Sequence, residues 1–291
     1  MIYFCADDYG VSKTSNDRIE KCLKNGVLNK ISVLPNGEID NFKERLSGEN
    51  VKLALHINLV EGAPLSSKDE VDMLVSNEGF FKYSFIGLFF RSLSKDKKQL
   101  EEQIYVELKR QIAFWKKKMG ENTPLLLDSH QHTHMIPLIF RTLMRVIKDE
   151  KINVEYIRIP AEPIIPYIKS PSLYFSFSIV GIIKQWLLKF LNLVNRRELR
   201  KSNFNSTKFL GILFSGKLDE EKLKRLLPHY QKYNRDIEIA FHPGYLENGE
   251  ALIDGCRPSF KKFYYSNRRK KEYDALINLK QTKEGKQNVL S

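Results

Sequence analysis

The stretch "PLLLDSHQHTHMIP", residues 124–137, contains three features that together indicate one kind of fold. Its apolar run is typical of a short buried strand, and the polar residues from Asp128 onward end that strand. Pro137 then opens a helical pattern. A strand, a polar loop and a helix in this order form one unit of an α/β protein with a parallel sheet. Three of the chain's six histidines lie in the loop, which makes it a candidate for chemistry as well.

The same unit recurs along the whole chain. Compact apolar runs predict strands at 2–6, 30–36, 51–59, 124–130, 154–160, 208–214 and 237–244. Helical patterns lie between them at 15–27 (with Ser15 as cap and Gly26 as stop), 97–120, 137–150 and 218–233. We therefore expect an α/β fold, a distorted TIM-like (β/α) barrel of about seven mostly parallel strands with outer helices, closed or nearly closed. One domain over 1–291 is expected, with an apolar helical insertion around 170–200.

The composition is that of a folded protein with a basic surface. Charged residues make up 29% of the 291 residues and hydrophobic residues 42%, which excludes a disordered chain. The net charge of +13 comes largely from basic residues at helical spacing, for example in 108–119 and 261–280. This spacing is typical of solvated helix faces, so we expect no nucleic-acid partner, although a positive surface also favours an anionic substrate or a membrane.

The cysteines and the first residues indicate where the protein acts. Cys5, Cys22 and Cys256 are scattered and odd in number, which favours a reducing compartment over structural disulfides. The opening "MIYFCADDYG" has no basic and then apolar region of a signal peptide. We expect a cytoplasmic protein, with the inner membrane surface as an alternative.

Polar side chains recur where the expected strands end. Asp7 and Asp8 end the first strand, His56 the third, His130 the fourth and His242 the last. In (β/α) barrels the carboxyl ends of the strands carry the chemistry. Each residue alone also has a structural interpretation, as a helix cap or a buried histidine. Together, an aspartate and two histidines have the composition of a metal site.

Six motifs together resemble the YdjC family of carbohydrate deacetylases. They are "ADDYGVSKTSN", "LALHINLVEGAPL", "LLDSHQHTHMIP", "RIPAEP", "FLGILFSG" and "EIAFHPGY", in order and over nearly the whole chain. The resemblance implies a distorted TIM-like barrel, one divalent metal ion and hydrolysis of an N-acetyl group on an amino sugar. It places the metal on Asp8, His56 and His130. The family implies Mg²⁺, whereas ligand chemistry favours Zn²⁺.

Further residues receive roles in amide hydrolysis, which needs a base, an acid and groups that hold the substrate. Asp7 is the candidate base and His242 the candidate acid. Arg158 of "RIPAEP" is a candidate substrate-binding residue, with a salt bridge to a carboxylate at the strand ends as the alternative. His132 and His134 leave the strand in a loop and are candidates to contact sugar hydroxyls or to orient a ligand.

The expected function is metal-dependent hydrolysis of an N-acetyl group from an acetylated amino sugar, such as N-acetylglucosamine in an oligosaccharide or glycolipid head group, releasing acetate. Two alternatives remain open. One is another metal-dependent hydrolase on the same barrel, such as a phosphoesterase, which would need more ligands for a second ion. The other is a noncatalytic basic glycan-binding protein.

Residues 170–197 are the part least explained by a barrel. Ser170 as cap and Pro171 as first residue predict a helix, and Lys184 and Lys189 make its apolar run too short to span a membrane. Small or polar residues recur near helical spacing at Ser178, Gly181, Gln185, Asn192 and Arg196. One interpretation is a homodimer interface. The other is peripheral membrane contact through residues 170–201, serving a lipid-linked substrate.

Overall fold

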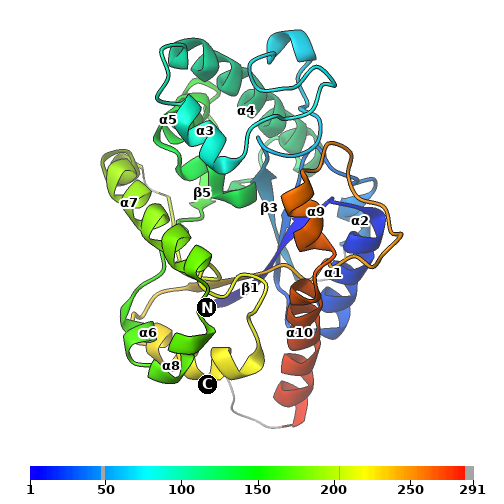
Figure 1. The fold of residues 1–291 in the computed structure, drawn as a ribbon, viewed down its shortest axis with the longest axis vertical. Coiled ribbons are helices and arrows are strands. Elements are labelled where there is room, and N and C mark those ends of the chain that lie inside the picture. The colour runs from blue at the N-terminus through cyan, green and yellow to red at the C-terminus, as the bar shows by residue number, and fades with distance from the viewer. Residues whose placement is uncertain (47–49, 203, 286–291) are drawn as a thin grey trace.

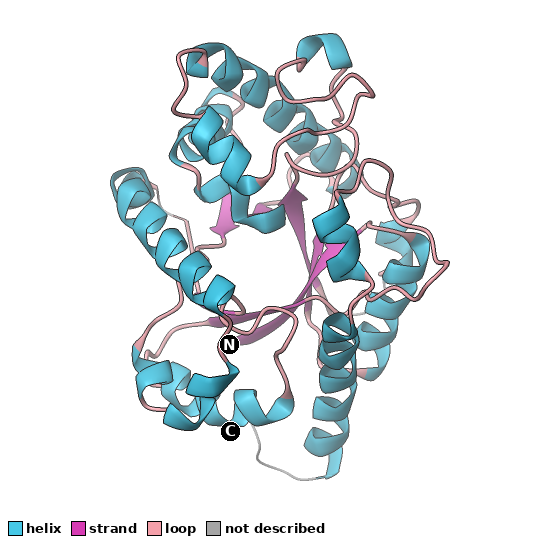
Figure 2. Ribbon diagram, viewed as in Figure 1, coloured by secondary structure: helices cyan, strands magenta, loops and turns pink. Residues whose placement is uncertain are grey.

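Seven parallel strands form one sheet in the order β5-β4-β3-β2-β1-β7-β6. The computed structural model describes residues 1–46, 50–202 and 204–285, and of 280–285 only the backbone. The strands are β1 Ile2–Tyr9, β2 Lys30–Val33, β3 Lys52–Ile57, β4 Leu125–Ser129, β5 Val154–Ile157, β6 Lys208–Leu210 and β7 Ile237–Phe241. Figure 2 shows them at the centre of the molecule, surrounded by helices. All seven expected strands and their parallel arrangement are confirmed.

The sheet curls into a half-barrel instead of closing into a ring. Its edge strands are short, since β5 has four residues and β6 three. In the described part of the chain, a parallel bridge between Tyr156 of β5 and Asn205, just before β6, connects the two edges of the sheet. Backbone hydrogen bonds accompany it from Ile157 N to Asn205 O (3.3 Å) and from Asn205 N to Glu155 O (3.1 Å). The expected barrel is therefore parallel and curved, but a complete ring is not formed.

Helices cover the sheet from outside. They are α1 Lys13–Asn25, α2 Phe42–Arg45, α3 Phe85–Arg91, α4 Lys97–Met119, α5 Pro137–Asp149, α6 Ile165–Ile168, α7 Ile179–Lys201, α8 Glu220–Gln231, α9 Pro258–Tyr264 and α10 Asn267–Gly285. Short 3-10 helices are η1 Lys68–Glu70, η2 His130–Met135 and η3 Pro171–Ser176. In Figure 1, α3, α4 and α5 gather at one end, α7 runs along one side, and α1, α9 and α10 lie on the other. Helices α4 and α5 match the expected ranges within one residue.

Two helix starts differ from the sequence-based expectation. The cap of α1 is Ser12, whose Oγ accepts a hydrogen bond from Ser15 N at 3.2 Å. Ser15 lies inside the helix and donates to the Gly244 carbonyl, so its assignment as the cap was wrong. Ser170 precedes only the η3 turn, and α7 begins later, where the Ser178 Oγ accepts from Gly181 N at 2.9 Å. Several serines near a helix start compete as caps, and the pattern alone does not select one.

Helix α7 packs inward with a mixed face, made of Gly181, Gln185 and Asn195 together with the buried Leu188 and Leu191. The Gln185 Nε2 donates to the Glu162 carbonyl at 2.8 Å, and the Asn195 Nδ2 donates to the Met135 carbonyl at 2.8 Å. At the exposed face lie Ile179, Val180, Ile182, Ile183, Trp186, Phe190, Leu193 and Val194. The helix therefore exposes an apolar face that a surface helix usually keeps polar. Among the described residues, none of the helices is both long and apolar enough to cross a bilayer. A homodimer and membrane contact through this helix stay predictions.

Candidate active site

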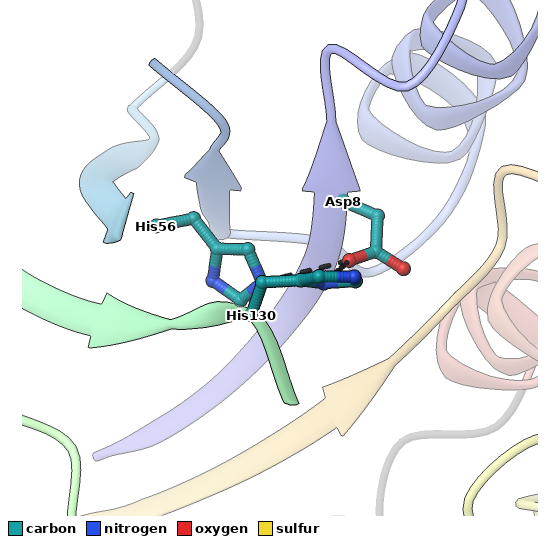
Figure 3. Close-up of side chains that lie close together, drawn as sticks. All are labelled: Asp8, His56 and His130. Atoms are coloured by element: carbon teal, nitrogen blue, oxygen red, sulfur yellow. Dashed lines mark ion pairs between the residues drawn. The ribbon is translucent and has the colours of Figure 1, made fainter. Parts of the chain in front are cut away.

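Asp8, His56 and His130 converge at the carboxyl ends of three strands. Asp8 lies in β1, His56 in β3 and His130 directly after β4, and Figure 3 shows the three side chains pointing to one place. The Asp8 Oδ1 is 2.8 Å from the His130 Nδ1 and 3.5 Å from the His56 Nε2. One ligand atom from each lies within 4.8 Å of the others. A carboxylate oxygen and two imidazole nitrogens at this spacing could hold one divalent metal ion.

Unusual backbone conformations place both neighbouring aspartates at this site. In a regular strand Asp7 and Asp8 would point to opposite faces. Here Asp8 has φ +69°, and the pairing of β1 with β2 shifts register between Ala6 and Tyr9. Both aspartates consequently line one pocket. Left-handed backbone recurs in the loop after β4, at Gln131 (φ +55°) and His132 (φ +61°). Such conformations are uncommon for residues other than glycine and gather at functional sites.

A carboxylate stands behind each histidine. The His56 Nδ1 is 2.5 Å from an oxygen of Asp128, its partner across β3 and β4. The His130 Nε2 is 3.1 Å from an oxygen of Glu61, which also accepts from the Tyr264 hydroxyl at 3.0 Å. An imidazole that donates one N–H to a carboxylate directs its other nitrogen at the metal position. The pattern fits histidines positioned as metal ligands.

The carboxylates control the charge of this cluster. Burial lowers the pKa of His56, but the negative charge of Asp128 outweighs it and raises the pKa to about 9. Burial likewise opposes a proton on His130, yet Asp8 and Glu61 raise its pKa to about 10. Burial raises the pKa of Asp8, and the charges of His130 and Arg269 reverse this and hold it well below its usual range. Without a metal ion, the cluster holds protons on the histidines, which a metal ion would displace.

Asp7 belongs to a different cluster, centred on Arg158. The Arg158 Nη1 lies 2.7 Å from the Asp7 Oδ2, and its Nη2 lies 2.9 Å from the Asp7 Oδ1. The same Nη2 is 2.9 Å from an oxygen of Asp128 and 2.6 Å from one of Glu238. Arg158 is fully buried and surrounded by acidic partners. The geometry thus favours the salt-bridge alternative for Arg158 over direct contact with substrate.

The pocket around the candidate ligands has an accessible volume of about 60 Å³. It is lined by Asp7, Asp8, His56, His130, Gln131, His132, Lys184, Ser215, His242, Phe260 and Phe263. The space is large enough for an ion and a few water-sized groups. His132 faces this pocket, and its buried Nδ1 has no hydrogen-bond partner among the described residues. His134 is instead held by Ser129 (2.5 Å from Nδ1) and by the Arg158 carbonyl (2.9 Å from Nε2).

The family model for YdjC-like proteins matches residues 1–283, nearly the whole chain. The chain belongs to the YdjC family. This confirms the family expected from the six motifs.

Two curated relatives of this YdjC-family chain are named carbohydrate deacetylase. The one from Clostridium beijerinckii is 30% identical over 191 residues, which cover 63% of this chain and 71% of the relative. The one from the zebrafish Danio rerio is 28% identical over 158 residues, covering 54% of this chain. The aligned part spans about half, 49%, of the length of the zebrafish relative.

A solved structure supports the fold. The crystal structure of an Enterococcus faecalis V583 protein described as a cellobiose-phosphate cleavage protein superposes with a TM-score of 0.64. The superposition covers 98% of this chain and 94% of that protein. Their sequences are 18% identical, so the likeness concerns the YdjC-family fold alone.

Sequence reasoning missed two buried residues of this YdjC-family site. Arg269, in a basic run expected to be a solvated helix face, is fully buried in α10 and donates to Asp8 Oδ2. Its Nε also donates to the His242 carbonyl at 3.1 Å. Glu272, one helical turn later, accepts from the His242 backbone N–H at 2.6 Å and lies 3.4 Å from its Nδ1. The one available signal was the i, i+3 spacing of a basic and an acidic residue, which is common on solvated helices.

Proposed function

We propose that this YdjC-family protein hydrolyses the N-acetyl group of an acetylated amino sugar and releases acetate. The main support for this proposal is that Asp8, His56 and His130 converge in one pocket, which Asp7 and His242 also line. A site of this kind offers ligands for a Lewis acid and two groups for proton transfer. The names of the two curated relatives support the same reaction class.

The ligand set fits one divalent metal ion. It has two imidazole nitrogens and one carboxylate oxygen, each histidine is oriented by its own carboxylate, and Arg269 occupies only the second oxygen of Asp8. When bound, such an ion would polarise the acetyl carbonyl and activate water. The donor chemistry favours Zn²⁺, whereas the family resemblance implies Mg²⁺.

Asp7 is the proposed base that takes the proton of the attacking water. Burial raises the pKa of Asp7, but the Arg158 guanidinium outweighs it, so the pKa lies below the usual value. Asp7 is therefore ionised at neutral pH. Both of its oxygens are bonded to Arg158, yet each keeps a further lone pair that can accept a proton. The pairing also fixes the carboxylate in place.

His242 is the proposed acid that protonates the leaving amine. It follows β7 and reaches the pocket from the side opposite β3 and β4 in the sheet order. Glu272 lies 3.4 Å from the Nδ1 and can hold the ring with its Nε2 turned to the pocket. Phe260 and Phe263 offer apolar ring faces for the sugar beside it. His132 is proposed as a further polar contact for the substrate.

The main alternative, a phosphoesterase with two metal ions, fits less well. Cys5, Asp7 and Asp128 form a second group with suitable spacing for metal ligation. The Arg158 Nη2 lies 3.2 Å from the Cys5 sulfur and 2.9 Å from oxygens of both aspartates. A guanidinium thus stands where the second ion would need to bind. The same buried constellation is more than a noncatalytic glycan-binding protein needs.

Acetate release from N-acetylglucosamine oligomers tests the proposal. We expect acetate from protein loaded with Zn²⁺ or Mg²⁺, and much less from Asp8→Ala treated in the same way. A parallel assay with a phosphate monoester addresses the alternative. Phosphate release without acetate release, dependent on Asp8, would overturn the proposed function.

A further inference from the structure

A second, apolar groove lies beside the candidate metal site. Its accessible volume is about 380 Å³, within the size range of small-molecule sites. Helix α3 contributes Phe85 and Ile86, and α7 contributes Val180, Ile183, Leu187 and Leu188. Sugar hydroxyls would lose hydrogen bonds to water on such a surface. The groove therefore suits hydrocarbon better than a second sugar ring.

The groove and the metal pocket share part of their walls. Gln131, Lys184 and Phe260 line both. A molecule with its acetyl group in the metal pocket can thus extend past these three residues into the groove. Lys184 is the charged residue of the groove lining, and it lies where the groove meets the metal pocket. The continuity argues for one ligand with a polar head and an apolar tail.

The packing of α7 shows that its apolar face is held outward by specific contacts. Gln185 and Asn195 fix the inner face through hydrogen bonds to the carbonyls of Glu162 and Met135. Gly181 also allows a close approach there, since a Cβ at this position would lie 2.8 Å from the Ser178 Oγ and 3.2 Å from the Leu213 carbonyl oxygen. These contacts set the rotation of the helix, so Ile183 remains 63% exposed beside the groove.

We propose that the groove between α3 and α7 binds an apolar chain attached to the acetylated sugar, so that the substrate is a glycolipid. This inference rests on the proposed deacetylase function and names its substrate class. The acetyl group occupies the metal pocket, the sugar ring lies at Gln131 and Phe260, and the chain lies on Val180, Ile183 and Leu187.

The test compares two substrates that differ only in the chain, the methyl and octyl glycosides of N-acetylglucosamine, below the micelle concentration of the octyl compound. We expect the octyl glycoside to have a KM at least about tenfold lower, because part of its chain leaves water. Ile183→Asn should remove most of this preference. Leu193→Asn is the matched control, because Leu193 is on the same helix and 65% exposed but is not part of the groove lining. It should keep the preference.

Direct binding separates this proposal from the proposed function. The same glycosides are titrated calorimetrically into wild-type protein and both variants. Octyl-selective binding that depends on Ile183, without acetate release from either compound, supports the groove and contradicts the deacetylase function. Equal KM and equal affinity for both glycosides, with acetate released, keeps the function and overturns the groove proposal. A dimer that Leu193→Asn dissociates, and whose formation excludes the octyl glycoside, also overturns it.

Discussion

Two acidic clusters lie side by side at the carboxyl ends of the strands, and they differ in the cation they are built around. In the first, Asp8 faces two histidines, whose protons a metal ion can displace. In the second, Asp7 and Asp128 face Arg158, whose guanidinium stays charged and is fully buried. Both clusters have spacings that could hold a metal ion. Arg269 contacts only the second oxygen of Asp8 in the first cluster, whereas Arg158 contacts both oxygens of Asp7 and one of Asp128 in the second. We therefore expect a metal ion in the first cluster and none in the second, where the protein's own cation already neutralises the carboxylates.

Removing a histidine from the first cluster should have the largest effect. His130→Ala is expected to lose most of the bound metal and with it the activity, because one of three ligand atoms disappears. His134→Ala should lose much less, since its two nitrogens face Ser129 and the Arg158 carbonyl. Metal per chain, measured by mass spectrometry after dialysis, checks this. Equal metal in His130→Ala and wild type would contradict the ligand assignment.

Removing the cation of the second cluster should destabilise the fold. Arg158→Met removes the cation shared by Asp7, Asp128 and Glu238, and we expect a loss of about 3–5 kcal/mol in the free energy of unfolding, mainly from Asp7, since Asp128 keeps His56 and Glu238 keeps Lys30. The control is Arg110→Met, which breaks an exposed pair with Glu70 and should cost about 0–1 kcal/mol. Urea denaturation measures both. Similar losses in the two variants would show that the buried cluster is not held together by Arg158.

Asp7 pairs with Arg158 in the second cluster but also lines the pocket of the first. Replacing it with the neutral asparagine tests whether it acts as a base or only holds the structure together. Asp7→Asn should lower kcat by roughly 10²-fold or more, the usual contribution of a general base, while bound metal is retained. Steady-state acetate release and a metal assay on the same preparation check this. A kcat within a few-fold of wild type would leave Asp7 with a structural role alone.

The smallest expected effect is a change in bound protons. The pKa values of His56 and His130, about 9 and about 10, exceed the unfolded value near 6.5, so both are protonated at pH 7 without metal. Their contribution to the stability of the metal-free protein is fully present below about pH 6.5 and is lost as the pH rises through 9 to 10. Metal binding at pH 7 should then release about two protons. Calorimetry in buffers of different ionisation enthalpy counts them, and a release near zero at pH 7 would show that the histidines are already neutral.

The sequence predicts the first cluster better than the second for a physical reason. Asp8, His56 and His130 each end a compact apolar run, and parallel strands bring such ends to one edge. Arg158 also ends a strand, but its partners come from three other strands, so its role depends on which faces meet inside the sheet. Arg269 carries no strand signal, because its buried position in α10 follows from tertiary packing.

Helix α7 shows a related limit. Periodicity separates the small and polar positions Gly181 and Gln185 from the apolar ones, but it does not say which side the protein covers. Contacts from distant parts of the chain, such as the Glu162 carbonyl opposite Gln185 and the Met135 carbonyl opposite Asn195, determine which side faces inward. The sequence likewise left open whether the barrel is closed or nearly closed, and the structure has a curled half-barrel with a three-residue edge strand, β6.

Asp8, Gln131 and His132 have left-handed backbone conformations, which lower the stability of the fold while their side chains line the pocket. Each such residue costs roughly 1–2 kcal/mol that glycine would avoid. Selection for thermal robustness alone would therefore favour glycine at Gln131 and His132, and each replacement would remove a side chain that lines the pocket. At Asp8 the gain would be outweighed, because glycine would leave the buried Arg269 without its carboxylate. We expect a search for more heat-resistant variants to reach Gln131 and His132 early and to return proteins with reduced activity.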